Sequence, residues 1–568
     1  MKLKSATSRK LRYGGVTAVL TALIIAVIIV INVIFSALSQ KLLWYTDLTP
    51  ELYFTLSENC IDLLENGDDE FGSTSAIEML DTHRAERRAE DPEFEDEELM
   101  INIIFCDDPD VWGGATADSA MRYVNETAGQ LQKEFPDYIQ VKYYNTVYNP
   151  SSVTKYGSGV TTTSVIIEYG TEYRVRALRD FYTFDTDDSE EPWAYNGEKI
   201  MAAAILAVTR AEAPIACITN NHGEQWVYGK NEQLLLTLDT AGFKVQQLDL
   251  AQQEIPEDCR LLVVMDPQQD FSIADGVTNI DEIAKLEDFL DEANSLMVFM
   301  SCEDRLNNFE EFLEEWGIVF NRYEEGNELH PLIVRDPSQA LLTEESENLY
   351  TIKANYYTEG GIGSDMTEEL RERSAVAPTI VFKNAMPISF NLEDSGFTMQ
   401  HYTDEEDETL SFDYATRYSD GVTRSIYDVF VTSENGEAWA NGARRDKATE
   451  ANPLKLLTVS TERYTTQEDN YSTLSEASYV IACGSPEFAD NDVLTNNSYG
   501  NNAFLEYALR VVGQEPVPVG LERKPFGDYT IDTVTTAEAT QYTVVLSVVP
   551  AVLAAGIGIF VIVRRKNR

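Results

Sequence analysis

Two long uncharged apolar stretches, one near each end of the chain, constrain this sequence more than any other feature. They cover residues 16–38 and residues 542–563. At about 1.5 Å per residue, a helix of either length reaches roughly 33 Å, enough to cross the hydrocarbon core of a bilayer. A cleaved signal peptide is the alternative for the first stretch. Its apolar region is usually shorter, however, and Ser36-Ala37-Leu38 is a poor cleavage site. We therefore expect one transmembrane helix at each end.

Basic residues flank both stretches on the side that faces away from the centre of the chain. These residues are Lys2, Lys4, Arg9, Lys10 and Arg12 before the first stretch, and Arg564, Arg565, Lys566 and Arg568 after the second. Lysine and arginine collect on the cytoplasmic side of membrane spans. We expect residues 1–15 and 564–568 to be cytoplasmic tails, and residues 39–541 to be extracytoplasmic.

The charge balance of the chain agrees with this topology. The sequence has 96 Asp and Glu against 43 Lys and Arg, for a formal net charge of −53. Nine of the basic residues lie in the two tails and every acid lies between the spans, which leaves 34 bases and a net charge of −62 for the intervening region. A surface of this sign repels nucleic acid and anionic headgroups. Nucleic-acid binding is excluded on this ground.

The sequence contains no motif for a metal or a cofactor. Its six cysteines are Cys60, Cys106, Cys217, Cys259, Cys302 and Cys483. They show neither C-x-x-C nor zinc-site spacing, and several sit in or beside apolar runs where free cysteine acts as a small buried hydrophobe. No G-x-x-x-x-G-K-[ST] loop is present to hold nucleotide phosphates. We expect no metal site and no cofactor.

The region after the first span has the pattern of a small α/β domain, residues 39–213. Its expected elements are strand 100–105, helix 119–135, strand 138–144, a hairpin of strands 164–169 and 172–178 around Gly170-Thr171, and helix 197–211. Residues 65–98 are acidic and polar without an apolar period, and we expect them to form a disordered insertion.

A larger α/β domain is expected to begin at residue 214. Buried-type strands alternate with helices over residues 214–330, which predicts a parallel, doubly wound sheet. Residues 331–452 lose this period and are expected to form an irregular or β-rich insertion. Apolar runs return within residues 453–515 and are expected to complete the same sheet. Residues 516–541 would link this domain to the second span.

Several short segments, in order along the chain, resemble the GldG-type auxiliary proteins of ABC transport systems. The segments are Asp47-Leu48-Thr49-Pro50-Glu51 with Tyr53 and Leu56-Ser57, Gly197-Glu198, the run 261–267 that ends in Asp266-Pro267, Cys483-Gly484-Ser485 with Phe488, Gly500-Asn501-Asn502, and Arg523-Lys524-Pro525. The resemblance implies an accessory subunit beside an ABC permease and its ATPase, in a bacterial cytoplasmic membrane. The larger domain is also similar to the glutamine-amidotransferase-like fold.

One segment departs from the family pattern. The family's T-G-H-G-E stands here as Asn220-Asn221-His222-Gly223-Glu224, with asparagine where the first glycine usually lies. This departure puts in question any ligand role that needs close backbone approach at Asn221. His222, Gly223 and Glu224 follow a strand, where open α/β sheets place ligands, and they are the candidate binding residues. The alternative is a simple turn, with the unusual dihedral at Gly223 and with His222 packed against Trp226.

Catalysis is not expected from this sequence. Cys302 follows a strand, where an amidotransferase-like nucleophile would sit, but Ser301, Glu303 and Asp304 give no glycine elbow. The two acids would also raise the pKa of the thiol. The sequence thus favours a non-enzymatic transporter subunit. An extracytoplasmic amidotransferase-like hydrolase and a solute-sensing membrane receptor remain as alternatives.

Overall fold

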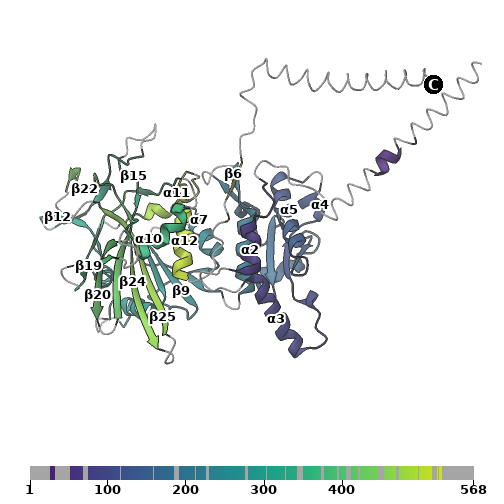
Figure 1. Ribbon diagram of the computed structural model, residues 1–568, viewed down its shortest axis with the longest axis horizontal. Helices are drawn as coiled ribbons and strands as arrows, with labels where there is room; N and C mark the ends of the chain where they lie inside the picture. Colours follow the sequence, from purple (N-terminus) through teal and green to yellow (C-terminus); the bar gives the residue numbers. More distant parts are fainter. Residues whose placement is uncertain are drawn as a thin grey trace, which may run out of the picture. The chain divides into compact units, whose positions relative to one another are not determined.

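The computed structural model describes most of the chain between residues 52 and 526 (Figure 1). The described residues are 23, 26–31, 52–67, 75–114, 117–157, 159–184, 191–210, 213–224, 229–274, 279–301, 304–326, 328–341, 349–372, 376–392, 396–403, 411–419, 422–445, 453–467, 473–496, 498–513, 521 and 523–526. The chain up to Lys524 forms one compact unit, and the residues from Pro525 onward form another.

The predicted membrane spans fall largely outside the described residues. Only residues 23 and 26–31 of the first stretch are described; they are helical, and their large apolar side chains are about half exposed, with Leu23 at 60% and Ile31 at 57%. Among the helices that the structure describes, none combines the length and the apolar character needed to span a bilayer. The second stretch, residues 542–563, is not described.

The first α/β region contains a four-stranded sheet in the order β2-β1-β3-β4. Strands β1 (Ile101–Phe105) and β2 (Ile139–Tyr143) are parallel and are joined by α5 (Ser119–Glu134), as the sequence predicted. Strands β3 (Ser164–Tyr169) and β4 (Glu172–Ala177) form the predicted hairpin, in which Gly170 has φ 60°. The β-α-β unit and the hairpin are both confirmed.

The prediction of a disordered insertion at residues 65–98 is wrong for residues 65–67 and 75–98, and residues 68–74 lie outside the described residues. Helix α3 (Ala76–Glu90) follows α2 (Glu58–Asn66) and is capped at its N-terminus by Ser75. The Ser75 Oγ accepts a hydrogen bond from the Glu78 N–H at 2.9 Å. Leu80 is fully buried, and Arg84 is only 3% exposed. The Arg84 guanidinium donates to the carbonyl oxygens of Leu99, Asp96 and Asp137. The buried face of α3 thus carries an arginine where an apolar residue is usual, and the sequence therefore lacks the apolar periodicity of a helix.

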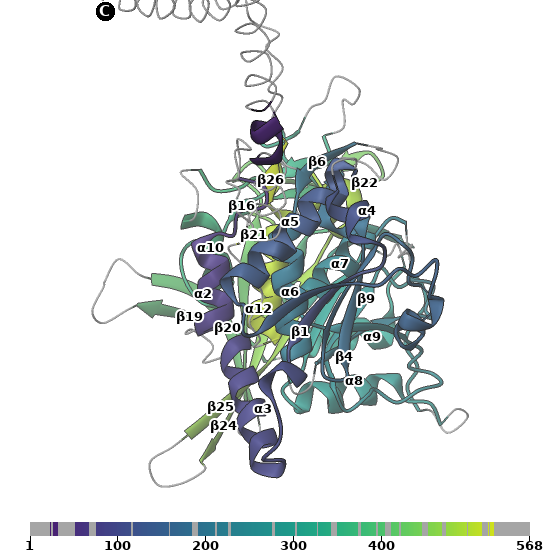
Figure 2. The ribbon, with the colours of Figure 1, turned by 90° about the vertical axis from the view of Figure 1, so that its right-hand side faces the viewer.

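Helix α6 (Gly197–Thr209) is buried at all thirteen positions. It contacts strands β3 and β4 of the small sheet, helices α2, α3 and α5, and helix α7 (Glu232–Thr240) of the second α/β region (Figure 2). An apolar surface all around a helix is typical of a helix enclosed on every side. Helix α6 is thus the element that the two α/β regions share.

The second α/β region is built on a sheet whose parallel part has the order β8-β7-β9-β10-β25. These strands are β7 (Ile215–Thr219), β8 (Lys244–Leu248), β9 (Cys259–Met265), β10 (Ser295–Phe299) and β25 (Thr473–Cys483). Helices α7 and α12 (Asn501–Gly513) share a core with one face of this part. Helices α8 (Glu282–Asp291) and α9 (Asn307–Glu315) share a core with the other face. The chain is therefore a mixed α/β protein with parallel strands in its sheets.

The same sheet continues on one side as an antiparallel half. Strand β24 (Lys455–Gln467) pairs with β25, and β21 (Val422–Val431), β20 (Ser411–Ser419) and β19 (Thr398–Thr403) follow in order. The prediction that the runs near residues 454–459 and 479–483 join the sheet is confirmed. The parallel sheet predicted over residues 214–330 is confirmed for β7, β8, β9 and β10, and the antiparallel half extends it. The described residues 398–403, 411–419 and 422–431 are part of the same sheet because their strands pair in register. Ala415, Ile426 and Phe430 are fully buried there.

The remaining elements are short. They are α4 (Pro109–Gly113), η1 (Asp96–Glu98), η2 (Pro150–Tyr156), η3 (Leu178–Phe181), β5 (Tyr182–Phe184), β6 (Pro192–Tyr195), β11 (Ile318–Phe320), β12 (Arg322–Glu325), β13 (Glu328–Pro331), β14 (Ile333–Arg335), β15 (Thr351–Lys353), β16 (Asn355–Tyr356), α10 (Ile362–Glu372), β17 (Val381–Lys383), β18 (Ile388–Phe390), β22 (Glu437–Ala440), β23 (Ala443–Arg444), η5 (Pro486–Ala489), α11 (Asn491–Leu494) and β26 (Lys524–Pro525).

Candidate functional site

The predicted binding residues lie in the loop that follows strand β7. Asn221 has φ 82° and Gly223 has φ 73°, so both adopt the left-handed backbone region. Asparagine is one of the few side-chain-bearing residues that visit this region readily. The asparagine that departs from the family pattern therefore still supports the left-handed turn.

His222 is locked in place from three sides. Its side chain is only 5% exposed, and its ring stacks on Phe271 with centroids 3.9 Å apart and planes 7° apart. Its Nδ1 lies 3.2 Å from Glu224 Oε1, and its Nε2 lies 3.1 Å from Glu282 Oε1. The predicted packing partner Trp226 lies outside the described residues, and the structure shows Phe271 against the ring. Both ring nitrogens are thus engaged by carboxylates.

The electrostatics of this cluster hold His222 in its charged form. Burial alone would lower the pKa of His222, but the hydrogen bonds and charges of Glu224 and Glu282 outweigh it and raise the pKa to about 9. Burial likewise opposes ionisation of the two carboxyl groups, yet their hydrogen bonds with His222 lower the pKa of each. An imidazolium between two carboxylates has no lone pair to offer to a proton or a metal. The cluster suits a structural role in the turn.

The His222 loop is joined to the loop that follows β9. The backbone N–H groups of Gln268 and Gln269 both donate to the His222 carbonyl oxygen at 2.8 Å. A Cβ at Gly223 would lie 3.2 Å from the Cβ of Gln268. Strands β7 and β9 are neighbours at the point where the strand order reverses, which is where open α/β sheets bind ligands. Here the two loops are hydrogen-bonded to each other, and Phe271 packs against His222.

Three polar residues, Asp266, Ser301 and Glu487, lie farther along the same edge, after strands β9, β10 and β25 respectively. Asp266 is 8% exposed with φ 47°, and its Oδ1 accepts from the Ser301 N–H at 2.8 Å. Burial raises the pKa of Asp266. Glu487 accepts from Asn384 Nδ2 at 3.1 Å through Oε1, and its buried Oε2 has no hydrogen-bond partner among the described atoms. Cys302, the alternative nucleophile, lies outside the described residues.

A second convergence of polar residues lies far from this edge, at the start of helix α6. The Ser57 N–H and Oγ both donate to Glu198 Oε1 at 2.6 Å. Lys524 Nζ lies 3.0 Å from Glu198 Oε2. We call Ser57, Glu198 and Lys524 the Glu198 node. The side chains of Glu198 and Lys524 are 6% and 17% exposed, so the ion pair is largely removed from water.

The backbone completes the Glu198 node. Lys524 Nζ also donates to the carbonyl oxygens of Leu52, Tyr53 and Thr55, at 3.0, 3.3 and 2.7 Å. Ser57 caps helix α2, because its Oγ accepts from the Cys60 N–H at 3.1 Å. Residues 52–57 follow the first predicted span, and Lys524 precedes the second. Their meeting point is absent from the sequence prediction, which treated residues 516–541 as a plain linker.

The two α/β regions of the compact unit meet through charged pairs. Arg176 forms an ion pair with Asp239 of α7, and Arg174 Nε lies 3.5 Å from the same carboxylate. Lys199 of α6 pairs with Glu506 of α12 at 2.5 Å, with both side chains at or below 10% exposed. Burial lowers the pKa of Arg176 to about 10. The joint is therefore held by desolvated charges.

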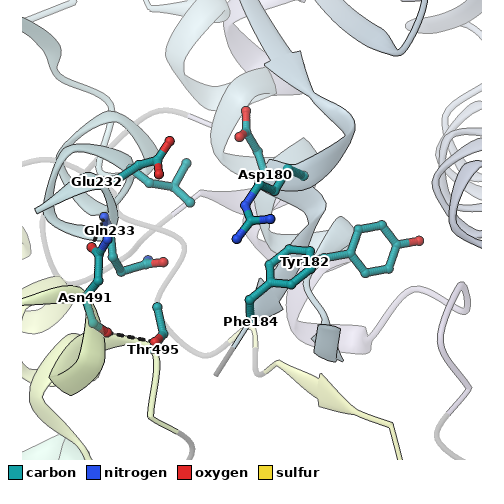
Figure 3. A pocket seen from close by; sticks show the side chains of 9 residues that line it. Asp180, Tyr182, Phe184, Glu232, Gln233, Asn491 and Thr495 are labelled. Atoms are coloured by element: carbon teal, nitrogen blue, oxygen red, sulfur yellow. Dashed lines mark hydrogen bonds between the residues drawn. The ribbon is translucent and has the colours of Figure 1, made fainter. Parts of the chain in front are cut away.

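Figure 3 shows a small cavity at this joint. It is lined from one side by Arg179, Asp180, Tyr182 and Phe184, and from the other by Glu232, Gln233, Leu236, Asn491 and Thr495. Its volume of about 70 Å³ is room for roughly two waters, at ~30 Å³ each. The Arg179 guanidinium lies 3.8 Å from the Phe184 ring centroid. We regard this cavity as part of the joint because an organic ligand needs several times this volume.

Comparison with known proteins adds a distant structural likeness. No family model matches the chain, and no curated protein matches it. Among solved structures, the mmIFT52 N-terminal domain aligns with a TM-score of 0.31 and 13% sequence identity, over 53% of this chain and 97% of that chain. A likeness at this score carries no argument about function.

Proposed function

We propose that this chain is a non-enzymatic auxiliary subunit of an ABC-type transport system in a bacterial cytoplasmic membrane. In this proposal residues 39–541 are extracytoplasmic, and the two predicted spans pack beside an ABC permease. The permease supplies the translocation path and its ATPase subunit supplies the energy. Two spans alone give too few helices to line a path for a polar substrate.

The observation that carries the proposal is the Glu198 node. Ser57, Glu198 and Lys524 come from three of the separate segments on which the family resemblance rests, and Ser57 and Lys524 both bind the Glu198 carboxylate directly. The node ties the chain leaving the first predicted span to the chain entering the second. These two chain segments bind Glu198 in the first turn of α6. Helix α6 in turn contacts the two α/β regions. In this proposal a movement of either span is passed to the second α/β region through α6, which contacts α7 and pairs with α12.

The strand order of the second α/β region supports a more specific fold assignment for that region. The parallel strands have the order 2-1-3-4-5 along the chain, with helices on both faces, which is a common doubly wound arrangement. We propose that the second α/β region is amidotransferase-like. The engagement of both His222 nitrogens by glutamates speaks against a hydrolase that uses this histidine as its base.

Purification of the full-length chain in a mild detergent tests the proposal. We expect an ABC permease and a nucleotide-binding subunit to co-purify in amounts comparable to the chain itself. Isolation of the chain without a permease would contradict the proposal, as would amide or ester hydrolysis that Cys302→Ser abolishes.

A further inference from the structure

A second cavity, much larger than the one at the joint, lies beside the loop that follows strand β10. Its volume is about 630 Å³, within the range of ~300–1,000 Å³ that is typical of small-molecule sites. Four segments line it: the loop after β10, the β12–β13 hairpin with the residues after it, the residue that precedes β15, and the β22–β23 hairpin. The lining residues are Asp304, Arg305, Glu328, Leu329, His330, Pro331, Ile333, Tyr350, Trp439, Ala440, Asn441 and Gly442. We call it the Trp439 cavity.

The aromatic wall of the Trp439 cavity is held rigidly. Trp439 Nε1 donates to Glu437 Oε2 at 2.8 Å, which fixes the orientation of the indole. The Arg335 guanidinium packs over the rings of both Trp439 and Tyr350, at 4.2 and 5.4 Å from their centroids. Rigid aromatic side chains give a ligand contact area at little entropic cost. Because the guanidinium already lies over these two rings, the wall offers a preformed, rigid apolar surface.

The uncompensated charge of the Trp439 cavity is negative. The Arg305 guanidinium is neutralised by Glu314, 2.6 Å away. Asp304 and Glu328 also line the cavity, and neither side chain forms an ion pair within the described part of the chain. The whole chain carries a formal net charge of −53, which enriches cations at its surface and repels anions.

From these observations we propose that the Trp439 cavity binds a small organic amine. Its ammonium groups pair with Glu328 and Asp304, and its hydrocarbon body lies against Trp439 and Tyr350. Charge-assisted hydrogen bonds to the two carboxylates favour an organic cation over a neutral molecule of the same shape. The aromatic wall adds apolar contact for the hydrocarbon body. The proposal needs no membrane partner, so it stands apart from the transport role proposed above.

Isothermal titration of the full-length chain in detergent, at about 150 mM salt to screen weak surface pairing, tests this inference. The probes are putrescine and 1,4-butanediol, which share a four-carbon chain and differ in their charged ends. We expect saturable binding of putrescine and none of the diol over the same concentrations. Glu328→Gln should weaken putrescine binding about tenfold, the loss expected for one charge-assisted contact.

The matched control is Glu311→Gln, which removes the same charge from an exposed position on α9, outside the cavity. This variant should bind putrescine as the unmodified chain does. Equal weakening by Glu328→Gln and Glu311→Gln would show diffuse counter-ion binding and overturn the proposal. Equal binding of the diol would overturn it as well, by showing a site without charge selection. Absence of any putrescine binding would also refute it.

Discussion

Replacing Glu282 by glutamine should destabilise the protein in a way that depends on pH. Glu282 is 1% exposed; its Oε1 faces His222 Nε2, and its Oε2 accepts from the Ser272 N–H at 2.8 Å. Both partners are donors when His222 is charged. A glutamine has one acceptor oxygen for two donors, and its amide group must meet one of them. The substitution therefore removes a counter-ion and leaves one buried donor unpaired.

The magnitude follows from the His222 pKa. The rise of this pKa from 6.5 to about 9 corresponds to ~3 kcal/mol of stabilisation, after allowing for solvent screening. About half of this stabilisation comes from each of the two carboxylates. The unpaired donor adds ~1 kcal/mol. We expect Glu282→Gln to cost roughly 2–3 kcal/mol at pH 6, which for a unit of this size lowers Tm by a few degrees.

The sign of the pH dependence is fixed by the directions of these shifts. The pKa of His222 is raised, so its contribution is complete below pH 6.5 and is lost as the pH rises through about 9. The pKa values of Glu224 and Glu282 are lowered from 4.5, so their contributions are present above that pH and fade below it. The gap between the unmodified chain and Glu282→Gln should be widest near pH 5–6.5 and should shrink above about 9.

Thermal unfolding followed by tryptophan fluorescence, at several pH values, measures this gap. Glu287→Gln is the matched control because it removes the same charge from an exposed position on the same helix. It should change Tm by less than a degree or so, as surface substitutions do. A Tm difference that stays constant from pH 6 to 10, or that equals the difference for the control, would refute the argument.

The remaining predictions concern the joint and the topology. Asp239→Asn should lower the free energy of unfolding by about 3–5 kcal/mol, because it leaves Arg174 and Arg176 buried without their shared counter-ion. The Tm of this variant measures the loss, and Asp288→Asn, at an exposed position, is the control. A loss no larger than the control's would contradict the prediction. A single cysteine at Glu86, on α3, should react with an impermeant thiol reagent in cells, and one at Ser5 should not. The reverse labelling pattern would overturn the proposed topology.

Much of the fold follows from periodicity in the sequence. The apolar run of β9 and the runs that became β24 and β25 were assigned to one sheet, because strands this apolar need cover on both faces. The continuation of the antiparallel half beyond β24 was missed for a physical reason. Its strands β20 and β21 alternate polar residues with the buried Ala415 and Ile426, and a half-buried strand of this kind resembles an irregular polar segment.

The candidate site was harder to predict than the fold, because its residues lie far apart in the sequence. The sequence marked His222 and Glu224, which are close in the chain, but gave no sign of Glu282 as the second carboxylate. Pairing across some sixty residues depends on the tertiary arrangement of β7 and α8, which periodicity does not encode. The same holds for the Glu198 node. Its three residues each lay in a segment that was singled out, yet only the fold brings Ser57 and Lys524 to one carboxylate.

The ATPase rate of the co-purified complex in lipid vesicles tests the central claim most directly. In Lys524→Met the ion pair with Glu198 and the three carbonyl contacts are lost, so the account predicts an assembled complex whose rate falls to that of permease and ATPase alone. Lys155→Met breaks an ion pair with Glu168 in the first α/β region, away from the node, and should keep the full rate. Equal rates for the unmodified chain and Lys524→Met would contradict the account.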